Sequence, residues 1–138
     1  MKLLLNRIKT PDGTILTSYH RHDFVTHTDK NGEMYGVDGG GEYARRIGNT
    51  NECEDLSVWV NEENLDTDFE LIRESLHWGT RGKNMDQPLR WVKMSEMSDE
   101  HLDALINIYK GPVDPFYKSC FEYEIYHRKK IGLTIKDN

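Results

Sequence analysis

The sequence predicts an α+β fold, in which an N-terminal antiparallel β meander of hairpins packs with a C-terminal helical hairpin. Residues 1–60 contain short runs of strand-forming side chains separated by turn signals, so they are predicted to be mainly β. Residues 67–131 carry apolar side chains at helical spacing and are predicted to be mainly α, with one strand near 88–94. A chain of 138 residues suits one domain of ordinary size, so a single domain is predicted over residues 1–138.

Two antiparallel hairpins are predicted in the first sixty residues. The first joins residues 3–8 and 14–19 across a Pro-Asp-Gly turn, in which proline presets one backbone angle and glycine accepts a positive φ. The second joins residues 24–28 and 34–37 across a turn that ends in Asn-Gly, a pair that supplies left-handed turn positions. Residues 56–60 have the composition of a further strand.

The C-terminal half shows three helical patterns. Residues 68–76 place apolar side chains at positions i, i+3 and i+7. A second helix is predicted to begin at Ser98, a preferred N-cap residue, and to end before a Gly-Pro pair. A third begins with the Asp-Pro pair at Asp114 and ends in the basic residues 128–130, where cations favour the helix dipole.

The composition limits the classes of partner. The formal net charge is -6, which argues against bulk DNA and anionic membranes, because both require a net basic surface. Cys53 and Cys120 are too few for a disulfide framework or a four-thiolate zinc site and suit a reducing cytosol. The apolar start, residues 1–7, is too short for a signal-peptide core. We therefore expect a soluble cytoplasmic protein that does not bind membranes.

The acids are unevenly distributed. Residues 51–74, called the acidic belt below, hold nine of the 24 acidic residues and one base, Arg73. A charge run of this kind is typical of a solvated face with a connecting loop. The functional alternative is an acidic docking surface or a nucleic-acid mimic.

A His-Arg-His-Asp motif at residues 20–23 is the first candidate site. In a strand, His20 and His22 would point to the same face, so two imidazoles could converge on a phosphate or a metal. A metal would need a third ligand, from His27 or Asp38. The structural alternative is that these polar side chains hydrogen-bond the turn between the two hairpins.

A glycine run at residues 39–41, followed by Arg45 and Arg46, is the second candidate site. The backbone N–H groups of a glycine run at a strand end can approach an anion, and two arginines can supply forked donors for phosphate. Residues 42–46 are predicted to form a short helix or turn. The segment lacks the Gly-Lys-Ser/Thr of a Walker motif, and the structural alternative is a glycine-rich turn with surface arginines.

The third candidate site is a loop at the end of a helix, residues 77–84, with the sequence His-Trp-Gly-Thr-Arg-Gly-Lys-Asn. Such a loop could stack a base on Trp78 and hold a phosphate with Arg81 and Lys83. The structural alternative is a tight loop anchored by a core tryptophan.

Catalytic signatures are absent from the rest of the sequence. The chain has no Gly-x-Ser-x-Gly elbow and no His-Glu-x-x-His motif. Cys120 lies on the apolar stripe of a predicted helix, where a small hydrophobic residue is expected. These observations favour a protein that is not an enzyme and that has neither a cofactor nor a metal site.

Three stretches of the N-terminal half stand out together: residues 18–24 (Ser-Tyr-His-Arg-His-Asp-Phe), 37–40 (Val-Asp-Gly-Gly) and 43–46 (Tyr-Ala-Arg-Arg). In these stretches the chain resembles a family of small phage and prophage proteins. In that family these elements accompany a zinc ribbon with paired cysteine knuckles. This chain has Thr-Pro-Asp-Gly at residues 10–13 and Asp-Lys-Asn-Gly at residues 29–32 instead, so the resemblance implies hairpin turns where the zinc site would be.

A second stretch, residues 74–106, contains Glu-Ser-Leu-His-Trp-Gly-Thr-Arg-Gly-Lys at 74–83 and Gln-Pro-Leu-Arg-Trp-Val at 87–92. With these motifs it is similar to a segment of small tailed-phage proteins of the T-even-like kind. The resemblance implies an accessory viral protein made in the infected cell, a class that includes host-takeover factors and inhibitors of bacterial immunity.

The leading hypothesis is a non-catalytic bacteriophage protein for counter-defence or host modulation, which sequesters a phosphate-bearing nucleotide signal in the host cytoplasm. One alternative is a protein–protein inhibitor of a host enzyme that acts through the acidic belt. Another is a metal-dependent phosphoesterase or nuclease that uses His20, His22 and Asp23. So small a chain is also consistent with a homo-oligomer. The candidate ligand-binding residues are His20, Arg21, His22, Asp23, Arg45, Arg46, Trp78, Thr80, Arg81 and Lys83.

Overall fold

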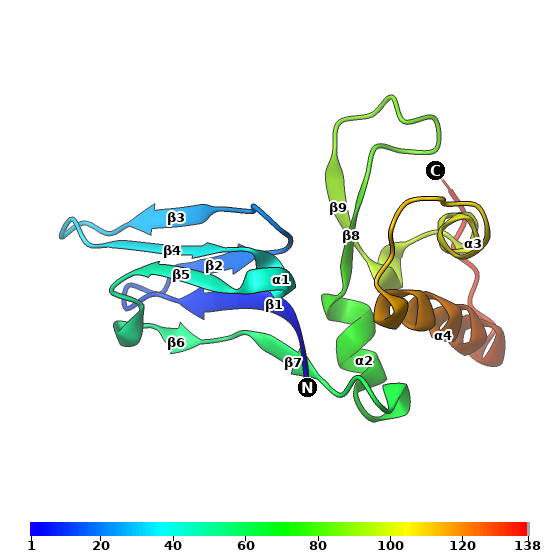
Figure 1. The fold of residues 1–138 in the computed structure, drawn as a ribbon, viewed down its shortest axis with the longest axis horizontal. Coiled ribbons are helices and arrows are strands. Elements are labelled where there is room, and N and C mark those ends of the chain that lie inside the picture. The colour runs from blue at the N-terminus through cyan, green and yellow to red at the C-terminus, as the bar shows by residue number, and fades with distance from the viewer. Residues whose placement is uncertain (138) are drawn as a thin grey trace. The chain divides into compact units, whose positions relative to one another are not determined.

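The α+β class is confirmed by the structure, a computed structural model that describes residues 1–137 (Figure 1). Antiparallel strands occupy the N-terminal half and helices dominate the C-terminal half. The sequence predicts one domain, and the contacts within the chain divide it into two compact units. Unit 1 is Met1–Asn61 and unit 2 is Glu62–Asn138.

Unit 1 contains two antiparallel sheets. In the first sheet, β1 (Lys2–Lys9) pairs with β2 (Ile15–Ser18), β6 (Glu54–Asp55) and β7 (Val58–Val60). In the second sheet, the strand order is β3 (Val25–Thr28), β4 (Met34–Asp38), β5 (Arg45–Gly48). Two short helices, α1 (Gly40–Tyr43) and η1 (Thr50–Glu52), complete the unit. Both predicted hairpins, β1–β2 and β3–β4, are therefore confirmed.

The two hairpin turns are closed by side-chain hydrogen bonds. In the first turn, the hydroxyl of Thr10 accepts a hydrogen bond of 3.1 Å from the N–H of Thr14. In the second turn, Asp29 Oδ1 accepts hydrogen bonds from the N–H groups of Asn31 and Glu33. Asp12 Oδ2 lies 2.8 Å from His27 Nε2. Hydrogen bonds from Thr10 and His27 lower the pKa of Asp12. Ordinary hydrogen-bonded turns thus stand at both places where the family resemblance would put cysteine knuckles.

The segment after the glycine run differs from its prediction. A short helix or turn is predicted over residues 42–46, but α1 ends at Tyr43 because Ala44 takes a left-handed conformation with φ 40°. Arg45 and Arg46 then begin β5, which pairs with β4. The further strand predicted at residues 56–60 is β7, and it begins only at Val58.

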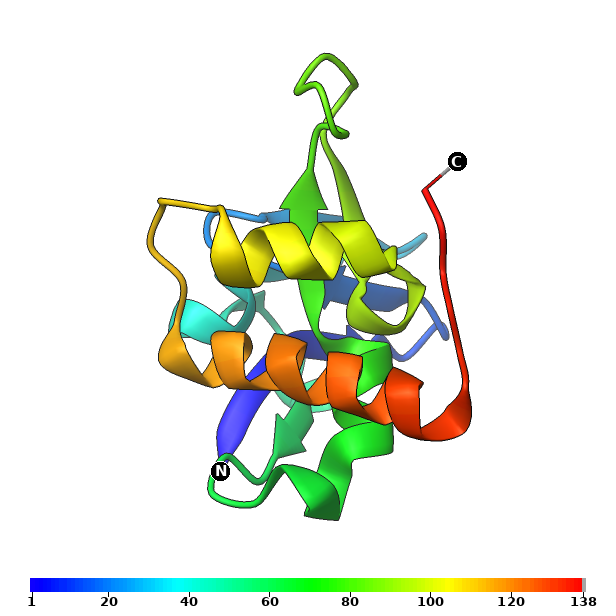
Figure 2. The ribbon, with the colours of Figure 1, turned by 90° about the vertical axis from the view of Figure 1, so that its right-hand side faces the viewer.

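Unit 2 contains three longer helices and a two-stranded hairpin. The helices are α2 (Leu65–Ser75), α3 (Asp99–Asn107) and α4 (Pro115–Ile131). The strands are β8 (His77–Thr80) and β9 (Arg90–Lys93), and the short helix η2 (Met94–Glu96) follows them. Figure 2 shows α3 and α4 side by side, as expected for a helical hairpin.

The helix starts follow the capping residues. Ser98 accepts a hydrogen bond from the N–H of His101, and Asp114 accepts one from the N–H of Phe116, so both predicted caps are confirmed. Helix α2 begins three residues earlier than the predicted range, because Asn64 caps it through the N–H of Asp66.

The prediction of a loop at residues 77–84 is wrong for its first four residues. They form β8, because each of them pairs with a residue of β9. The strand predicted near 88–94 is confirmed as β9, over a shorter range.

Each unit has its own buried residues. In unit 1, Ile8, Leu16, Tyr35 and Val37 form a cluster. In unit 2, buried side chains come from the three longer helices, from β9 and η2 and from the residue that follows α2. They include Phe69, Ile72, Leu76, Val92, Met94, Leu102, Leu105, Cys120 and Phe121. The predicted apolar stripe of α2 and the buried position of Cys120 are therefore confirmed.

The basic end predicted for α4 is confirmed, and its residues Lys129 and Lys130 are exposed, whereas Arg128 is not. Arg128 is buried, and its guanidinium donates to the carboxylates of Glu124 and Asp99 at 2.7 and 2.9 Å. The segment after α4 continues back to α3, since the N–H of Asp99 donates to the carbonyl of Ile135 at 2.8 Å. Among residues 1–137, no helix has both the length and the apolar character needed to cross a membrane.

Candidate functional site

The first two candidate sites converge in unit 1. The N–H of Gly40 donates to Ser18 Oγ at 2.9 Å, and that hydroxyl donates to the carbonyl of Asp23 at 2.7 Å. A Cβ atom on Gly40 would lie 2.5 Å from the backbone nitrogen of His20, so the two segments touch through their backbones. We call residues 18–24 and 38–45 together the turn cluster.

The hydroxyl of Tyr43 connects the two segments of the turn cluster. It donates to Asp38 Oδ1 at 3.1 Å, accepts from the N–H of His22 at 3.0 Å and lies 3.1 Å from His22 Nδ1. Because the hydroxyl has one proton and an ionised carboxylate can only accept, Nδ1 of His22 must carry a proton. We assign this tautomer from the hydrogen bonds, and it leaves Nε2 of the neutral ring as an acceptor.

The His-Arg-His-Asp motif forms a turn between β2 and β3. The prediction that His20 and His22 share one face of a strand is therefore wrong, because His22 has a left-handed φ of 65°. Asp23 Oδ2 accepts from the N–H of Tyr19 at 2.8 Å and lies 3.8 Å from His20 Nε2. Nδ1 of His20 lies 2.8 Å from the carbonyl of Arg21, to which it donates. These contacts agree with the structural alternative, in which the polar side chains of the motif form hydrogen bonds within the turn.

Left-handed backbone is concentrated in the turn cluster. Among residues 1–137, three residues other than glycine have a positive φ, and two of them, His22 and Ala44, belong to the turn cluster. Gly39 and Gly40 add φ values of 88° and 53° in the same place. A positive φ is unfavourable for a side chain with a Cβ atom, and such strain is more frequent at functional sites.

The three arginines of this region have different surroundings. The guanidinium of Arg46 is hydrogen-bonded within unit 1, since it donates to Asp55 Oδ1 at 2.7 Å and to Ser57 Oγ at 2.8 Å. Hydrogen bonds from Ser57 and Arg46 lower the pKa of Asp55. Arg45 is exposed, and its backbone is directly opposite Asp38 in the β4–β5 register.

Arg21 is also exposed, and it lies 3.9 Å from a carboxylate oxygen of Glu42, which is about as exposed. Arg21 and Arg45 are thus the two guanidinium groups of the turn cluster that face solvent.

Two aromatic side chains flank the turn and were not among the predicted site residues. Tyr19 is 39% exposed and Phe24 is 56% exposed. Their positions next to the His-Arg-His-Asp motif were visible in the sequence. Their exposure was not, because both also suit the interior of a strand.

The predicted residues of the third candidate site belong to unit 2. Trp78 makes edge-to-face contacts with Tyr109 and Phe121, with ring centroids 5.8 and 5.7 Å apart, so it anchors the hairpin to the helices. Thr80 Oγ1 accepts from the N–H of Gly82 at 3.1 Å.

The two cations that follow Thr80 differ in their surroundings. Lys83 Nζ lies 2.7 Å from Glu100 Oε1, and this contact raises the pKa of Lys83. The Arg81 side chain is exposed and forms no ion pair among the residues that the structure describes.

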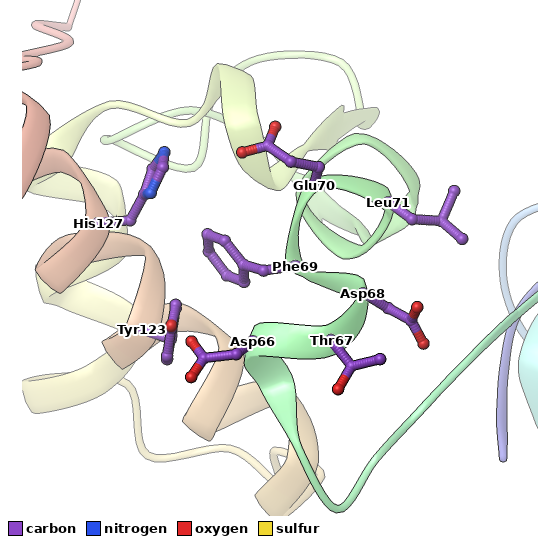
Figure 3. A pocket seen from close by; sticks show the side chains of 8 residues that line it. All are labelled: Asp66, Thr67, Asp68, Phe69, Glu70, Leu71, Tyr123 and His127. Atoms are coloured by element: carbon purple, nitrogen blue, oxygen red, sulfur yellow. The ribbon is translucent and has the colours of Figure 1, made fainter.

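Part of the acidic belt borders a hollow of about 420 Å³ between α2 and α4. Figure 3 shows the side chain of Phe69 pointing toward Tyr123 and His127, with Asp66 and Glu70 on the same side. The ring of Phe69 is 4.4 Å from that of Tyr123, measured between centroids. The hollow therefore combines an aromatic floor with carboxylates, and none of the predicted ligand-binding residues lines it.

Among residues 1–137, no three His, Cys, Asp or Glu side chains are grouped so that they could hold a metal ion.

The geometry defines an α+β protein with exposed arginines at both candidate places, Arg21 and Arg45 in the turn cluster and Arg81 in the β8–β9 hairpin. The chain matches no protein-family model, no curated protein and no solved structure.

Proposed function

We propose that the protein is a non-catalytic binder that sequesters a phosphate-bearing nucleotide at the turn cluster. The observation that carries this proposal is the convergence of the His20–Asp23 turn with the glycine run, through Ser18, Gly40 and the Tyr43 hydroxyl. Two segments with phosphate-binding character are thereby brought to one place on unit 1.

The exposed groups of the turn cluster suit the two parts of a nucleotide. Arg21 and Arg45 offer forked N–H donors, which bind phosphate oxygens in pairs. The imidazole of His22 has its Nδ1 engaged within the turn, so its Nε2 becomes a further donor to phosphate when the ring is protonated. Tyr19 and Phe24 offer exposed aromatic faces, on which a base can stack.

Binding without turnover is favoured because the two carboxylates of the turn cluster already accept hydrogen bonds within the turn. Asp23 accepts from the backbone of Tyr19, and Asp38 accepts from Tyr43, so both carboxylates hold the turn in place. A general base or a metal ligand needs a lone pair directed at the substrate or ion.

The resemblance to small tailed-phage proteins supports a setting for this function. A protein that removes a nucleotide signal from solution would protect a phage against a host defence that depends on that signal. The proposed location is the cytoplasm of the infected bacterium, where such signals are produced. A homo-oligomer would carry several nucleotide sites in each assembly.

A second candidate function is supported by the hollow beside the acidic belt. Carboxylates of Asp66 and Glu70 next to the rings of Phe69 and Tyr123 suit a basic side chain of a protein partner. In this function the protein inhibits a host enzyme by direct contact. Charge reversal at Glu62, Glu63 and Asp66 would then release a partner recovered from bacterial lysate.

Isothermal titration tests the proposed function. Wild-type protein is titrated with a panel of cyclic and ADP-ribose-type nucleotides, and at least one is expected to bind. The double variant Arg21→Gln/Arg45→Gln is expected to bind that nucleotide at least about tenfold more weakly, a loss of about 1.4 kcal/mol. Arg46→Gln is the matched control, because Arg46 is engaged with Asp55 and Ser57, and it should keep the affinity within about twofold.

Two results would contradict the proposed function. The proposal is wrong if no nucleotide in the panel releases heat or changes the melting temperature. Conversion of a bound nucleotide to product in the presence of a divalent metal, abolished by His22→Ala, would establish the phosphoesterase alternative instead.

A further inference from the structure

The loop between β8 and β9, residues 81–89, is called the hairpin loop below. Two of its apolar side chains are exposed, Met85 to 71% and Leu89 to 51%. Its first residue, Arg81, is also exposed and forms no ion pair among residues 1–137. Methionine and arginine are both enriched where proteins contact one another, so this loop has the composition of an interface.

Hydrogen bonds hold the hairpin loop in one shape. The N–H of Gln87 donates to the carbonyl of Arg81 at 2.9 Å, and the N–H of Met85 donates to the carbonyl of Gly82 at 3.2 Å. These bonds place Arg81 at the base of the loop and Met85 nearer its tip. Met85 has a positive φ of 59°, a strained conformation that is more frequent at functional sites. A loop that is already ordered loses little conformational entropy when it binds.

The hollow between α2 and α4 has a rim and a floor of different character (Figure 3). The carboxylates of Asp66 and Glu70 are exposed and form its rim. The ring of Phe69 is buried and lies 4.4 Å from the half-buried ring of Tyr123, measured between centroids, and the two rings form its floor. The hollow thus offers aromatic surface at depth and negative charge at its entrance.

The hairpin loop is complementary to both parts of this hollow. A methionine sulfur packs favourably against aromatic rings, and a guanidinium forms paired hydrogen bonds with a carboxylate. Met85, near the tip of the loop, would reach the floor while Arg81, at its base, meets the rim.

The hairpin loop cannot occupy the hollow of its own chain. Figures 1 and 2 both show this loop at one end of unit 2 and α2 at the opposite end, with α3 between them. The hollow is therefore open to the loop of another copy.

We propose that the hairpin loop of one copy docks in the hollow of a second copy, with Met85 against the aromatic floor and Arg81 at the carboxylate rim. The contact is made by unit 2 alone and does not involve the proposed nucleotide site in unit 1. It assigns to a second copy the hollow that the second candidate function assigns to a host enzyme.

A contact of this kind uses two different surfaces of each copy. A pair of copies joined in this way keeps one loop and one hollow unoccupied, so further copies add head to tail until a ring closes or a chain forms. One loop in one hollow buries less area than the roughly 1,200 Å² of a stable interface. We therefore expect weak, concentration-dependent association, with a dissociation constant of about 10–100 µM.

Sedimentation equilibrium of the wild-type chain tests the inference. Between about 10 µM and about 1 mM protein, the weight-average mass is expected to rise at least about twofold. Two variants should remain monomeric over this range, because each removes one of the two surfaces. The loop variant is Arg81→Glu/Met85→Ser, and the hollow variant is Asp66→Lys/Glu70→Lys.

An equimolar mixture of the two variants gives the sharpest result. The loop variant keeps an intact hollow, and the hollow variant keeps an intact loop. The mixture should therefore form a one-to-one dimer that grows no further, although each variant alone is monomeric.

The matched control is Glu52→Lys/Glu54→Lys, which makes the same charge change in exposed residues of the acidic belt that do not line the hollow. It should associate with a dissociation constant within about twofold of the wild-type value. An unchanged circular dichroism spectrum checks that each variant is folded. The loop variant alters only exposed residues, so it still tests the inference if the hollow variant is unfolded.

Four results would overturn the inference. These are a wild-type chain that stays monomeric at about 1 mM, association that persists in the loop variant, equal losses in the hollow variant and its control, and a mixture of variants that stays monomeric. If the wild type stays monomeric and charge reversal at Asp66 releases a host protein instead, the hollow belongs to the second candidate function.

Discussion

The buried carboxylate of Glu124 accepts two hydrogen bonds of 2.8 Å from the guanidinium of Arg73, which is 51 positions away in the sequence. Arg128 donates a third bond to the same carboxylate at 2.7 Å. The pair joins α2 to α4, and contact with Glu124 raises the pKa of Arg73. A bidentate ion pair between two helices thus lies within unit 2, where an apolar contact would be usual.

Glu124→Gln should destabilise unit 2 by about 3 kcal/mol, because it removes the anion and leaves the buried guanidinium of Arg128 and the partly buried one of Arg73 undercompensated. Urea denaturation followed by helical circular dichroism measures this loss, since α2, α3 and α4 all belong to unit 2. Glu122→Gln, an exposed change on the same helix, should alter the free energy of unfolding by less than about 0.5 kcal/mol. Equal effects of the two substitutions would contradict the prediction.

Local signals in the sequence were sufficient for most of the secondary structure. The Pro-Asp-Gly and Asn-Gly turns predict both hairpins, because glycine at Gly13 and Gly32 takes the positive φ that these turns need. Ser98 and Asp114 predict their helix starts, because each side chain accepts a backbone hydrogen bond within its own first turn. Signals of this kind act over a few residues, which makes them readable without the fold.

Features that depend on distant partners were not predictable in this way. The burial of Glu124 requires Arg73, and the strand at Arg45 requires β4 as a partner. In the candidate site, the sequence predicts strand geometry for the motif at residues 20–23, whereas the folded chain has a left-handed turn at His22 that Tyr43 holds. The contact between Gly40 and His20 is likewise visible only in the folded chain.

Gly40→Ala should destabilise unit 1 by about 3 kcal/mol, through left-handed strain and through a clash of its Cβ with the backbone of His20 at 2.5 Å. Gly13→Ala is the control, because Gly13 also has a positive φ but nothing lies within 4 Å of its Cβ position. It should cost only about 1 kcal/mol. The free energy of unfolding of unit 1, followed by backbone amide NMR signals, distinguishes the two, and equal costs would contradict the close approach of the two segments.

Tyr43→Phe should release the ring of His22 while leaving the fold of unit 1 intact. The substitution removes the hydroxyl that contacts Asp38 and His22, at a cost of about 1 kcal/mol in stability. Nitrogen NMR of the imidazole should report the Nδ1–H tautomer of His22 in the wild type and a mixture of tautomers in the variant. The same tautomer in both proteins would show that the hydroxyl does not set it. Tyr19→Phe serves as a control in the same turn.

The stability of unit 2 should fall as the solution becomes mildly acidic. Burial lowers the pKa of His101 and of His77 below the ordinary value for an imidazole, and the Asp137 carboxylate partly opposes the shift at His101. Below about pH 6.5 the unfolded chain therefore binds protons that the folded chain does not, and the free energy of unfolding decreases until the folded state also becomes protonated. Urea denaturation at a series of pH values between about 7.5 and 5 measures this loss.

His101→Gln should flatten the profile, whereas His20→Gln, a change in unit 1, should leave the unfolding of unit 2 with the wild-type pH dependence. A profile that is equally steep in wild type and His101→Gln would show that the burial of this imidazole does not contribute.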